Sequence, residues 1–198
     1  MSRRFSTLRL FTAAASAALL PNAAWAHVGH GSTVGFVHGF VHPVTGLDHV
    51  LAMVAIGMFA AHLGGRAVWA VTATFVAAMA LGGGLGFAGI AVPFVETGIA
   101  VSVIVLGLAV ALQWKAPVVA AMALAGLFAI FHGHAHGAEM PADAGGLAYG
   151  AGFLLATAAL HGIGIAMITL GRVHAPRAIP LGGLAMASAG VGIMAGVI

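Results

Sequence analysis

The chain contains no cysteine and very few charged residues. Without cysteine it can form neither disulfides nor thiolate metal sites, so any metal must be held by imidazole, carboxylate, thioether or backbone oxygen. Only 6% of the 198 residues are charged and 62% are hydrophobic, whereas a soluble domain carries about 25% charged residues. Such a chain cannot cover a water-exposed surface. We therefore predict an all-α integral membrane protein.

Other absences narrow the class of protein further. No cluster of basic residues is available to meet a phosphate backbone, so no nucleic-acid partner is expected. The Gly82-Gly83-Gly84 run lies in an apolar segment without the lysine and serine or threonine of a P-loop, and no ATP-binding motif is present. There is also no HExxH motif. We predict neither an enzyme nor a prosthetic group, and make no prediction of oligomeric state.

Residues 1–26 have the features of a cleavable signal peptide. Arginines near the start precede an apolar run from Leu10 to Leu20, about half the length that spans a bilayer. Pro21 follows, and Ala24-Trp25-Ala26 has the small-x-small pattern of a cleavage site. Cleavage would leave 27–198 as a single transmembrane domain with its N-terminus outside. An uncleaved anchor helix is the alternative.

Six apolar segments follow, each near the ~20 residues that a spanning helix requires. The first runs from Val34 or Gly46 to Leu63, and the others cover about 67–89, 94–113, 117–134 (extending toward 138), 145–170 and 179–198. These predict a bundle of six transmembrane helices. Two glycine pairs, Gly82/Gly86 and Gly192/Gly196, have the small-xxx-small spacing that lets membrane helices approach closely.

The few charges predict the orientation of this bundle. The connections after the first, third and fifth segments hold every basic residue beyond the signal peptide: Arg66, Lys115, Arg172 and Arg177. The other connections hold acidic residues: Glu96, Glu139 and Asp143. The positive-inside rule places the basic connections in the cytoplasm, in agreement with the signal peptide. We predict a bacterial inner-membrane protein with a periplasmic mature N-terminus.

Most of the eleven histidines fall on the predicted outer side, and one stretch combines His42, Asp48 and His49. Such side chains at a membrane edge are expensive and usually mark a transport path or metal site. In one continuous helix His42 and His49 would share a face, with Pro43 at the first helical position. Asp48 would then either orient a ligating imidazole or reach the ion itself. Helix capping with interfacial hydrogen bonds is the alternative without a metal.

A second cluster lies at the outer end of the fourth segment. His132, His136 and Glu139 follow i, i+4, i+7 spacing and would line one helix face, although a helix ending before Glu139 would leave only the histidine pair. His134 points elsewhere. Secondary candidates are His27 and His30 as a capture site, His38, Glu96 as a third carboxylate or gate, and His161 as a deep relay ligand or an interhelical hydrogen-bonding group.

The ligand set indicates the kind of metal. Imidazole and carboxylate without thiolate suit Ni²⁺, Co²⁺, Zn²⁺ or Cu²⁺. Asp48 and Glu139 together would neutralise one dication, easing its partial dehydration in a low-dielectric site. The expected partners are therefore a transition-metal ion, as transported substrate, and the lipid bilayer.

Two motifs carry a family resemblance: His42-x5-Asp48-His49 and the run from Phe131 to Glu139, FHGHAHGAE. Both resemble the signatures of the HupE/UreJ family of nickel permeases. The resemblance implies an uptake permease for Ni²⁺, with Co²⁺ as the alternative, that supplies hydrogenase or urease maturation. It also implies functional roles for His42, Asp48, His49, His132, His136 and Glu139, and Glu96 resembles an acidic position of the family.

Two other functions fit a membrane protein with histidine clusters. An intramembrane metalloenzyme could use histidine boxes to hold metals, but the clusters face outside, whereas a di-iron oxygenase usually takes electrons from the cytoplasm. A metal-sensing accessory subunit would have no transport activity of its own, and the sequence offers no soluble domain or long cytoplasmic tail for signalling. Transport by the protein alone in liposomes would exclude the sensor.

Overall fold

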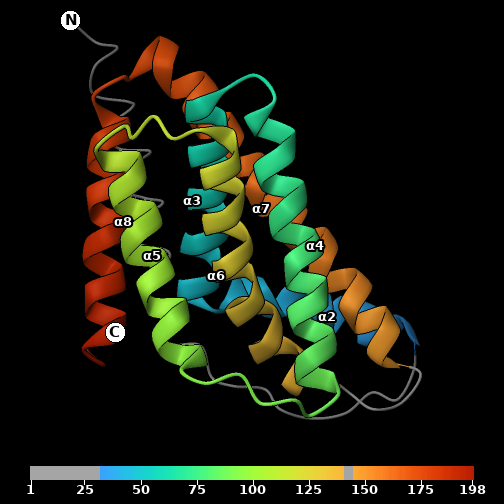
Figure 1. Ribbon diagram of the computed structural model, residues 1–198. Coiled ribbons are helices and arrows are strands. Elements are labelled where there is room, and N and C mark those ends of the chain that lie inside the picture. Colours follow the sequence, from blue (N-terminus) through green and yellow to red (C-terminus); the bar gives the residue numbers. More distant parts are fainter. Residues whose placement is uncertain (1–31, 141–144) are drawn as a thin grey trace, which may run out of the picture.

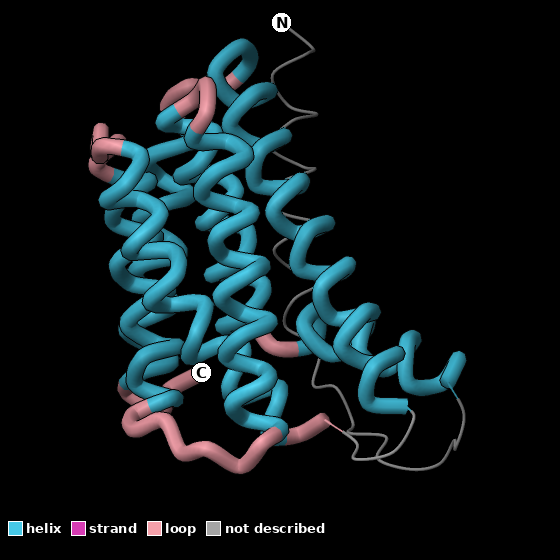
Figure 2. Tube along the Cα trace, turned by 45° about the vertical axis from the view of Figure 1, so that its right-hand side comes forward, coloured by secondary structure: helices cyan, strands magenta, loops and turns pink. Residues whose placement is uncertain are grey.

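The computed structural model describes residues 32–140 and 145–198, and these form helices joined by short connections, without a strand in that part of the chain (Figures 1 and 2). The helices are α2 (Ser32–Thr45), α3 (Leu47–Leu63), α4 (Ala67–Phe87), α5 (Val95–Ala111), α6 (Val118–Ala138), α7 (Gly145–His174) and α8 (Ala178–Met194). The all-α prediction is confirmed for these residues. The predicted signal peptide, His27, His30 and Asp143 lie outside them.

Helix α3 is the centre of the bundle. It contacts every other described helix, and its residues from Ala52 to Ala61 are all buried. A helix that is apolar on all sides must be surrounded by other elements, and the Ala- and Met-rich sequence of α3 meets that condition. The outer helices expose large apolar side chains such as Trp69, Val119 and Leu147, as lipid contact requires.

The remaining helices pack around α3 as three pairs: α4 with α6, α2 with α7, and α5 with α8. Glycines allow each close approach. A methyl group added at Gly82 or Gly86 would collide with carbonyls of α6, so this predicted contact is confirmed. The prediction for Gly192/Gly196 is wrong, because Gly196 follows α8 with a positive φ of 66° and a methyl group there would meet nothing within 4 Å.

The first predicted segment is divided into two helices. Helices α2 and α3 meet at Gly46, which is extended (φ −88°, ψ 118°), and the pair bends by 83°. The Thr45 hydroxyl donates to the carbonyl of His42 at 2.7 Å, which satisfies a carbonyl group at the end of α2. The prediction of a shared helix face for His42 and His49 is therefore wrong. Pro43 lies inside α2, not at the first helical position.

The two ends of the bundle differ in charge. The connections holding Arg66, Lys115 and Arg177 gather at one end, the top of Figure 1. There His62 Nε2 lies 2.9 Å from the carbonyl of Gln113, and Arg172 donates to the carbonyl of His62 at 2.9 Å, joining α3, α7 and the α5–α6 connection. The opposite end holds Glu96 in the first turn of α5 and Glu139 directly after α6.

The helices indicate a multi-pass membrane protein. Within the described residues, α4, α6 and α7 are long and apolar enough to cross a bilayer, and the bent pair α2–α3 passes the same test when taken together. Helices α5 and α8 are apolar but shorter, with 17 residues each. All five helices from α4 to α8 coincide with predicted segments within a few residues.

Candidate metal-binding site

A cavity of about 280 Å³ opens at the acidic end of the bundle. Helices α2, α3, α5 and α6 provide its walls, since the lining residues are His42, Thr45, Gly46, Asp48, His49, Glu96, Ile99, Ala135, His136 and Glu139. The two predicted clusters, about 90 residues apart in the sequence, therefore share one cavity. Its lining combines imidazoles with three carboxylates.

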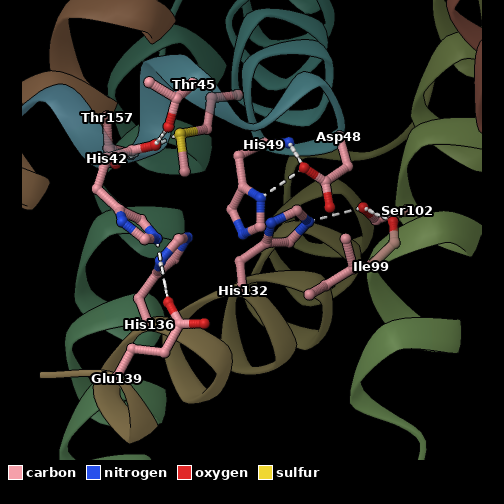
Figure 3. Close-up of polar contacts among 11 residues, drawn as sticks. His42, Thr45, Asp48, His49, Ile99, Ser102, His132, His136, Glu139 and Thr157 are labelled. Atoms are coloured by element: carbon pink, nitrogen blue, oxygen red, sulfur yellow. Dashed lines mark hydrogen bonds and ion pairs between the residues drawn. The ribbon is translucent and has the colours of Figure 1, made fainter. Parts of the chain in front are cut away.

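At the mouth of the cavity, three predicted ligands converge. His42 Nε2 lies 3.1 Å from Glu139 Oε2, and His136 Nδ1 lies 3.9 Å from the same oxygen (Figure 3). One ligand atom from each residue can be chosen so that all three lie within 4.8 Å of one another. Two ligands of one transition-metal ion are separated by up to about 4 Å, so small side-chain movements would let these three share an ion.

Asp48 fixes the orientation of the His49 ring. Its Oδ1 lies 2.7 Å from His49 Nδ1 and also accepts the backbone N–H of His49 at 2.8 Å. Because a carboxylate only accepts hydrogen bonds, the proton of the neutral imidazole resides on Nδ1, and Nε2 carries the free lone pair. The geometry thus favours the orienting role for Asp48 over direct contact with the ion.

Ser102 of α5 does the same for His132. The Ser102 hydroxyl donates its one proton to the carbonyl of Ile99 at 2.6 Å. Its oxygen also lies 2.8 Å from His132 Nε2, so Nε2–H is the donor of that bond. The lone pair of His132 is therefore on Nδ1. Both residues are completely buried.

The ring of His136 lies between His42, at the mouth of the cavity, and the deeper histidines His49 and His132. Its ring centroid is 4.8 Å from that of His42 and 4.1 Å from that of His49, which in turn is 4.7 Å from that of His132. Four ring nitrogens in this group are buried and accept or donate no hydrogen bond to a described residue: His49 Nε2, His132 Nδ1 and both nitrogens of His136. Burying polar atoms in this way is costly, and a bound metal ion would offset that cost for each nitrogen that it ligates.

The other predicted residues lie around or away from this group. His38 contacts the His42 ring from one turn earlier in α2, with centroids 5.9 Å apart. Glu96 is exposed and lines the cavity. His134 points away, as predicted, and its Nε2 lies 2.8 Å from the carbonyl of Ile90. His161 is buried deeper, with its ring 5.1 Å from that of Phe75.

Three residues near the site were not predicted from the sequence. Besides Ser102, these are Tyr149 and Phe153 of α7. The Tyr149 ring lies edge-on to the rings of His38 and His42. The centroid of the Phe153 ring lies 4.1 Å from that of the His136 ring. Tyr149 is the only tyrosine of the chain, and its position at the start of a predicted span was the one signal that could have identified it.

The fold and the site together define a multi-pass helical membrane protein with a cluster of histidines and carboxylates at one end of its bundle. The model of the HupE / UreJ protein family matches residues 15–193, so the chain belongs to the HupE/UreJ family. It is 48% identical over 187 residues to the protein HupE of Rhizobium leguminosarum bv. viciae, covering 93% of this chain and 97% of that protein. No solved structure gives a significant match.

Proposed function

We propose that the protein is an uptake permease for a divalent transition-metal ion, with Ni²⁺ as the first candidate and Co²⁺ as the second. One observation carries the proposal: His42 of α2 and His136 and Glu139 at the end of α6 bring three ligand atoms together at a cavity that opens at one end of the bundle. The protein acts as a transporter without catalytic activity of its own.

The ligand chemistry supports a late transition metal. Three imidazoles, those of His42, His49 and His136, line the cavity, and no thiolate is available in this cysteine-free chain. Imidazole nitrogen suits nickel, cobalt, copper and zinc, whereas Mg²⁺, Ca²⁺ and Mn²⁺ prefer oxygen ligands. The Asp48 and Glu139 carboxylates match the charge of one dication. A metal ion entering the mouth would take the place of the direct His42–Glu139 contact, in which Nε2 and Oε2 lie 3.1 Å apart.

The charge difference between the ends supports an inward direction of transport. By the positive-inside rule the end with Arg66, Lys115, Arg172 and Arg177 faces the cytoplasm. The cavity then faces the periplasm of a bacterial inner membrane, where the ion is captured. Six crossings would be made by the bent α2–α3 pair and the helices α4 to α8. In keeping with the family, the imported ion would supply hydrogenase or urease maturation.

The first experiment is accumulation of ⁶³Ni²⁺ by cells and by proteoliposomes. His42→Ala, His49→Ala and Glu139→Ala should each abolish high-affinity accumulation at unchanged protein level. His174→Ala is the control, because His174 is an exposed histidine in the last turn of α7, at the end of the bundle away from the cavity. Normal accumulation in all three site variants would contradict the assignment of the site.

A competition experiment then tests the metal and the role of the imidazoles. Excess unlabelled Co²⁺ should reduce ⁶³Ni²⁺ uptake, and Mn²⁺ should not. Imidazolium must lose a proton before the ring can bind a metal. Acidifying the solution on the side of the cavity should therefore weaken Ni²⁺ uptake, whereas acidifying the opposite side should not weaken Ni²⁺ binding at the cavity. Uptake that stays constant from pH 8 to 5 would contradict histidine ligation.

A further inference from the structure

Further from the acidic end than the cavity, three helices bring two thioethers and a hydroxyl together in the bundle core. The Thr157 hydroxyl of α7 lies 3.4 Å from Met53 Sδ of α3 and 3.8 Å from Met79 Sδ of α4. The same hydroxyl donates to the carbonyl of Phe153 at 3.0 Å. Because its one proton is engaged there, the sulfur lone pairs remain available. All three side chains are at most 1% exposed.

An imidazole with one unpaired nitrogen lies next to Thr157 along α7. His161 lies one turn beyond Thr157 on the same face of α7. It is 2% exposed, and its Nε2 is buried without a hydrogen bond to any described residue. Gly57 allows α3 to lie directly against the His161 backbone, since a methyl group there would collide with the His161 carbonyl. This close approach brings the Met53 turn of α3 beside Thr157.

These groups continue the line of histidines above them. Met53 lies about one turn after His49 on α3, a step of about 6 Å along the helix. The Phe75 ring contacts His132 on one side, with centroids 6.1 Å apart, and His161 on the other at 5.1 Å. His161 lies near the middle of α7, about three turns from Tyr149 at the cavity end and three from Arg172 at the basic end. Ligand-type side chains thus extend from the cavity to the centre of the bundle.

We propose that Met53, Met79 and His161 form a second metal site, deeper than the cavity, which takes a late transition-metal ion. Buried methionines alone would be ordinary packing. Packing does not account for the buried, unpaired nitrogen of His161, whose cost an apolar residue at that position would avoid. Thioether sulfur with imidazole binds borderline and soft ions and discriminates against hard oxygen-seeking cations.

The charge of this second site differs from that of the first. Thioethers, hydroxyl and imidazole are neutral, and the carboxylates Asp48 and Glu139 belong to the cavity. A dication is therefore held more weakly here than in the cavity, and weak binding suits a site that an ion must leave. Its place as a step in permeation rests on the proposed uptake function, whereas the metal site itself stands on these residues alone.

The decisive experiment is nickel X-ray absorption spectroscopy on the purified protein at two loadings. With one equivalent of Ni²⁺, the spectrum should show only nitrogen and oxygen ligands. With excess Ni²⁺, a second, weaker equivalent should bind and add a sulfur scatterer. Met53→Leu/Met79→Leu should lose both the sulfur signal and the second equivalent. Met58→Leu/Met186→Leu is the matched control, because it replaces two buried methionines elsewhere in the core by residues of similar volume.

Two further measurements separate this site from the cavity. His42→Ala/Glu139→Gln should retain the sulfur signal at high Ni²⁺ concentration. In proteoliposomes, Met53→Leu/Met79→Leu should lower the turnover of Ni²⁺ transport at least tenfold without weakening binding of the first equivalent.

If the wild type fails to transport Ni²⁺, the proposed function is wrong, but the sulfur signal still decides the second site. Absence of that signal from the loaded wild type, or its persistence in Met53→Leu/Met79→Leu, would overturn the second site.

Discussion

Asp48 Oδ1 accepts two hydrogen bonds from His49, one from the ring Nδ1–H at 2.7 Å and one from the backbone N–H at 2.8 Å. The carboxylate therefore holds the ring in one tautomer and one orientation, and directs the lone pair of Nε2 away from itself. Outer partners of this kind raise metal affinity 10–100-fold in other proteins.

The first prediction separates this orienting role from direct ligation. Asp48→Asn retains an oxygen that can accept from Nδ1–H, whereas Asp48→Ala retains none. We expect Asp48→Ala to weaken Ni²⁺ binding by about 10–100-fold and Asp48→Asn to weaken it less, since it loses the negative charge but keeps an acceptor for Nδ1–H. Calorimetric titration measures both affinities. Equal losses in both variants would show instead that the negative charge or direct contact with the ion is what matters.

The second prediction concerns Ser102, whose oxygen accepts from His132 Nε2–H. Ser102→Ala removes the group that selects the tautomer, and the ring can then present either nitrogen. We expect about tenfold weaker Ni²⁺ binding, and ¹⁵N NMR of labelled histidine should show a second tautomer of His132. If Ser102 only packed in the core, Ser102→Ala would leave the tautomer of His132 unchanged.

The matched control for Ser102→Ala is Thr72→Val. The Thr72 hydroxyl also donates to a carbonyl of its own helix, that of Val68 at 2.7 Å, but it contacts no histidine. Removal of this hydroxyl should change neither Ni²⁺ affinity nor the His132 spectrum. Ser102→Ala should lose more thermal stability than Thr72→Val, by about 1–3 kcal/mol, because it leaves a buried nitrogen of His132 without its partner.

The sequence predicted relations within a helix better than relations between helices. His132 and His136 were correctly placed on one face because α6 is continuous, and Glu139 stays close to them although the helix ends at Ala138. The His42–His49 relation was wrong because it required a helix that continues through Gly46. The sequence left the start of this segment open between Val34 and Gly46, but it did not predict two helices that meet at an 83° bend.

The pairing of Ser102 with His132 could not be predicted at all. It joins α5 to α6 across 30 residues, and one serine in an apolar helix looks the same whether it bonds to its own helix or to a ligand. The thioethers near Thr157 are a similar case, because methionine in a membrane helix is ordinarily packing. Such contacts depend on the rotation of each helix about its axis, which nearly uniform apolar sequences leave undetermined.

The third prediction concerns the space between Gly46 and the Asp48–His49 pair. A methyl group on Gly46 would lie 2.9 Å from Asp48 Oδ1 and 3.2 Å from His49 Nδ1. Gly46→Ala should therefore displace the Asp48–His49 pair and weaken Ni²⁺ binding by about tenfold, as measured by calorimetric titration.

The control is Gly182→Ala in α8, where an added methyl group would meet nothing within 4 Å. This variant should bind Ni²⁺ like the wild type. Undiminished binding by Gly46→Ala would show that the orientation of the pair contributes little to affinity, and would also weaken the first prediction.

The fourth prediction concerns the glycines beside the metal-site histidines of α6. Gly133 and Gly137 each follow a site histidine directly, and both face α4. A methyl group at Gly137 would collide with the Gly83 carbonyl, and one at Gly133 with the Met79 carbonyl. These glycines let α6 pack against α4, and this contact sets the position of His132 and His136 in the cavity.

Gly137→Ala should separate the two helices and reduce stability by about 1–3 kcal/mol, the usual cost of overpacking. We expect a lower midpoint of thermal unfolding in detergent together with weaker Ni²⁺ binding, because His136 moves with the helix. Gly84→Ala in α4 is the matched control, since an added methyl group there would meet nothing within 4 Å. It should unfold and bind Ni²⁺ as the wild type does, and equal behaviour of the two variants would contradict the close α4–α6 contact on which the position of the histidines depends.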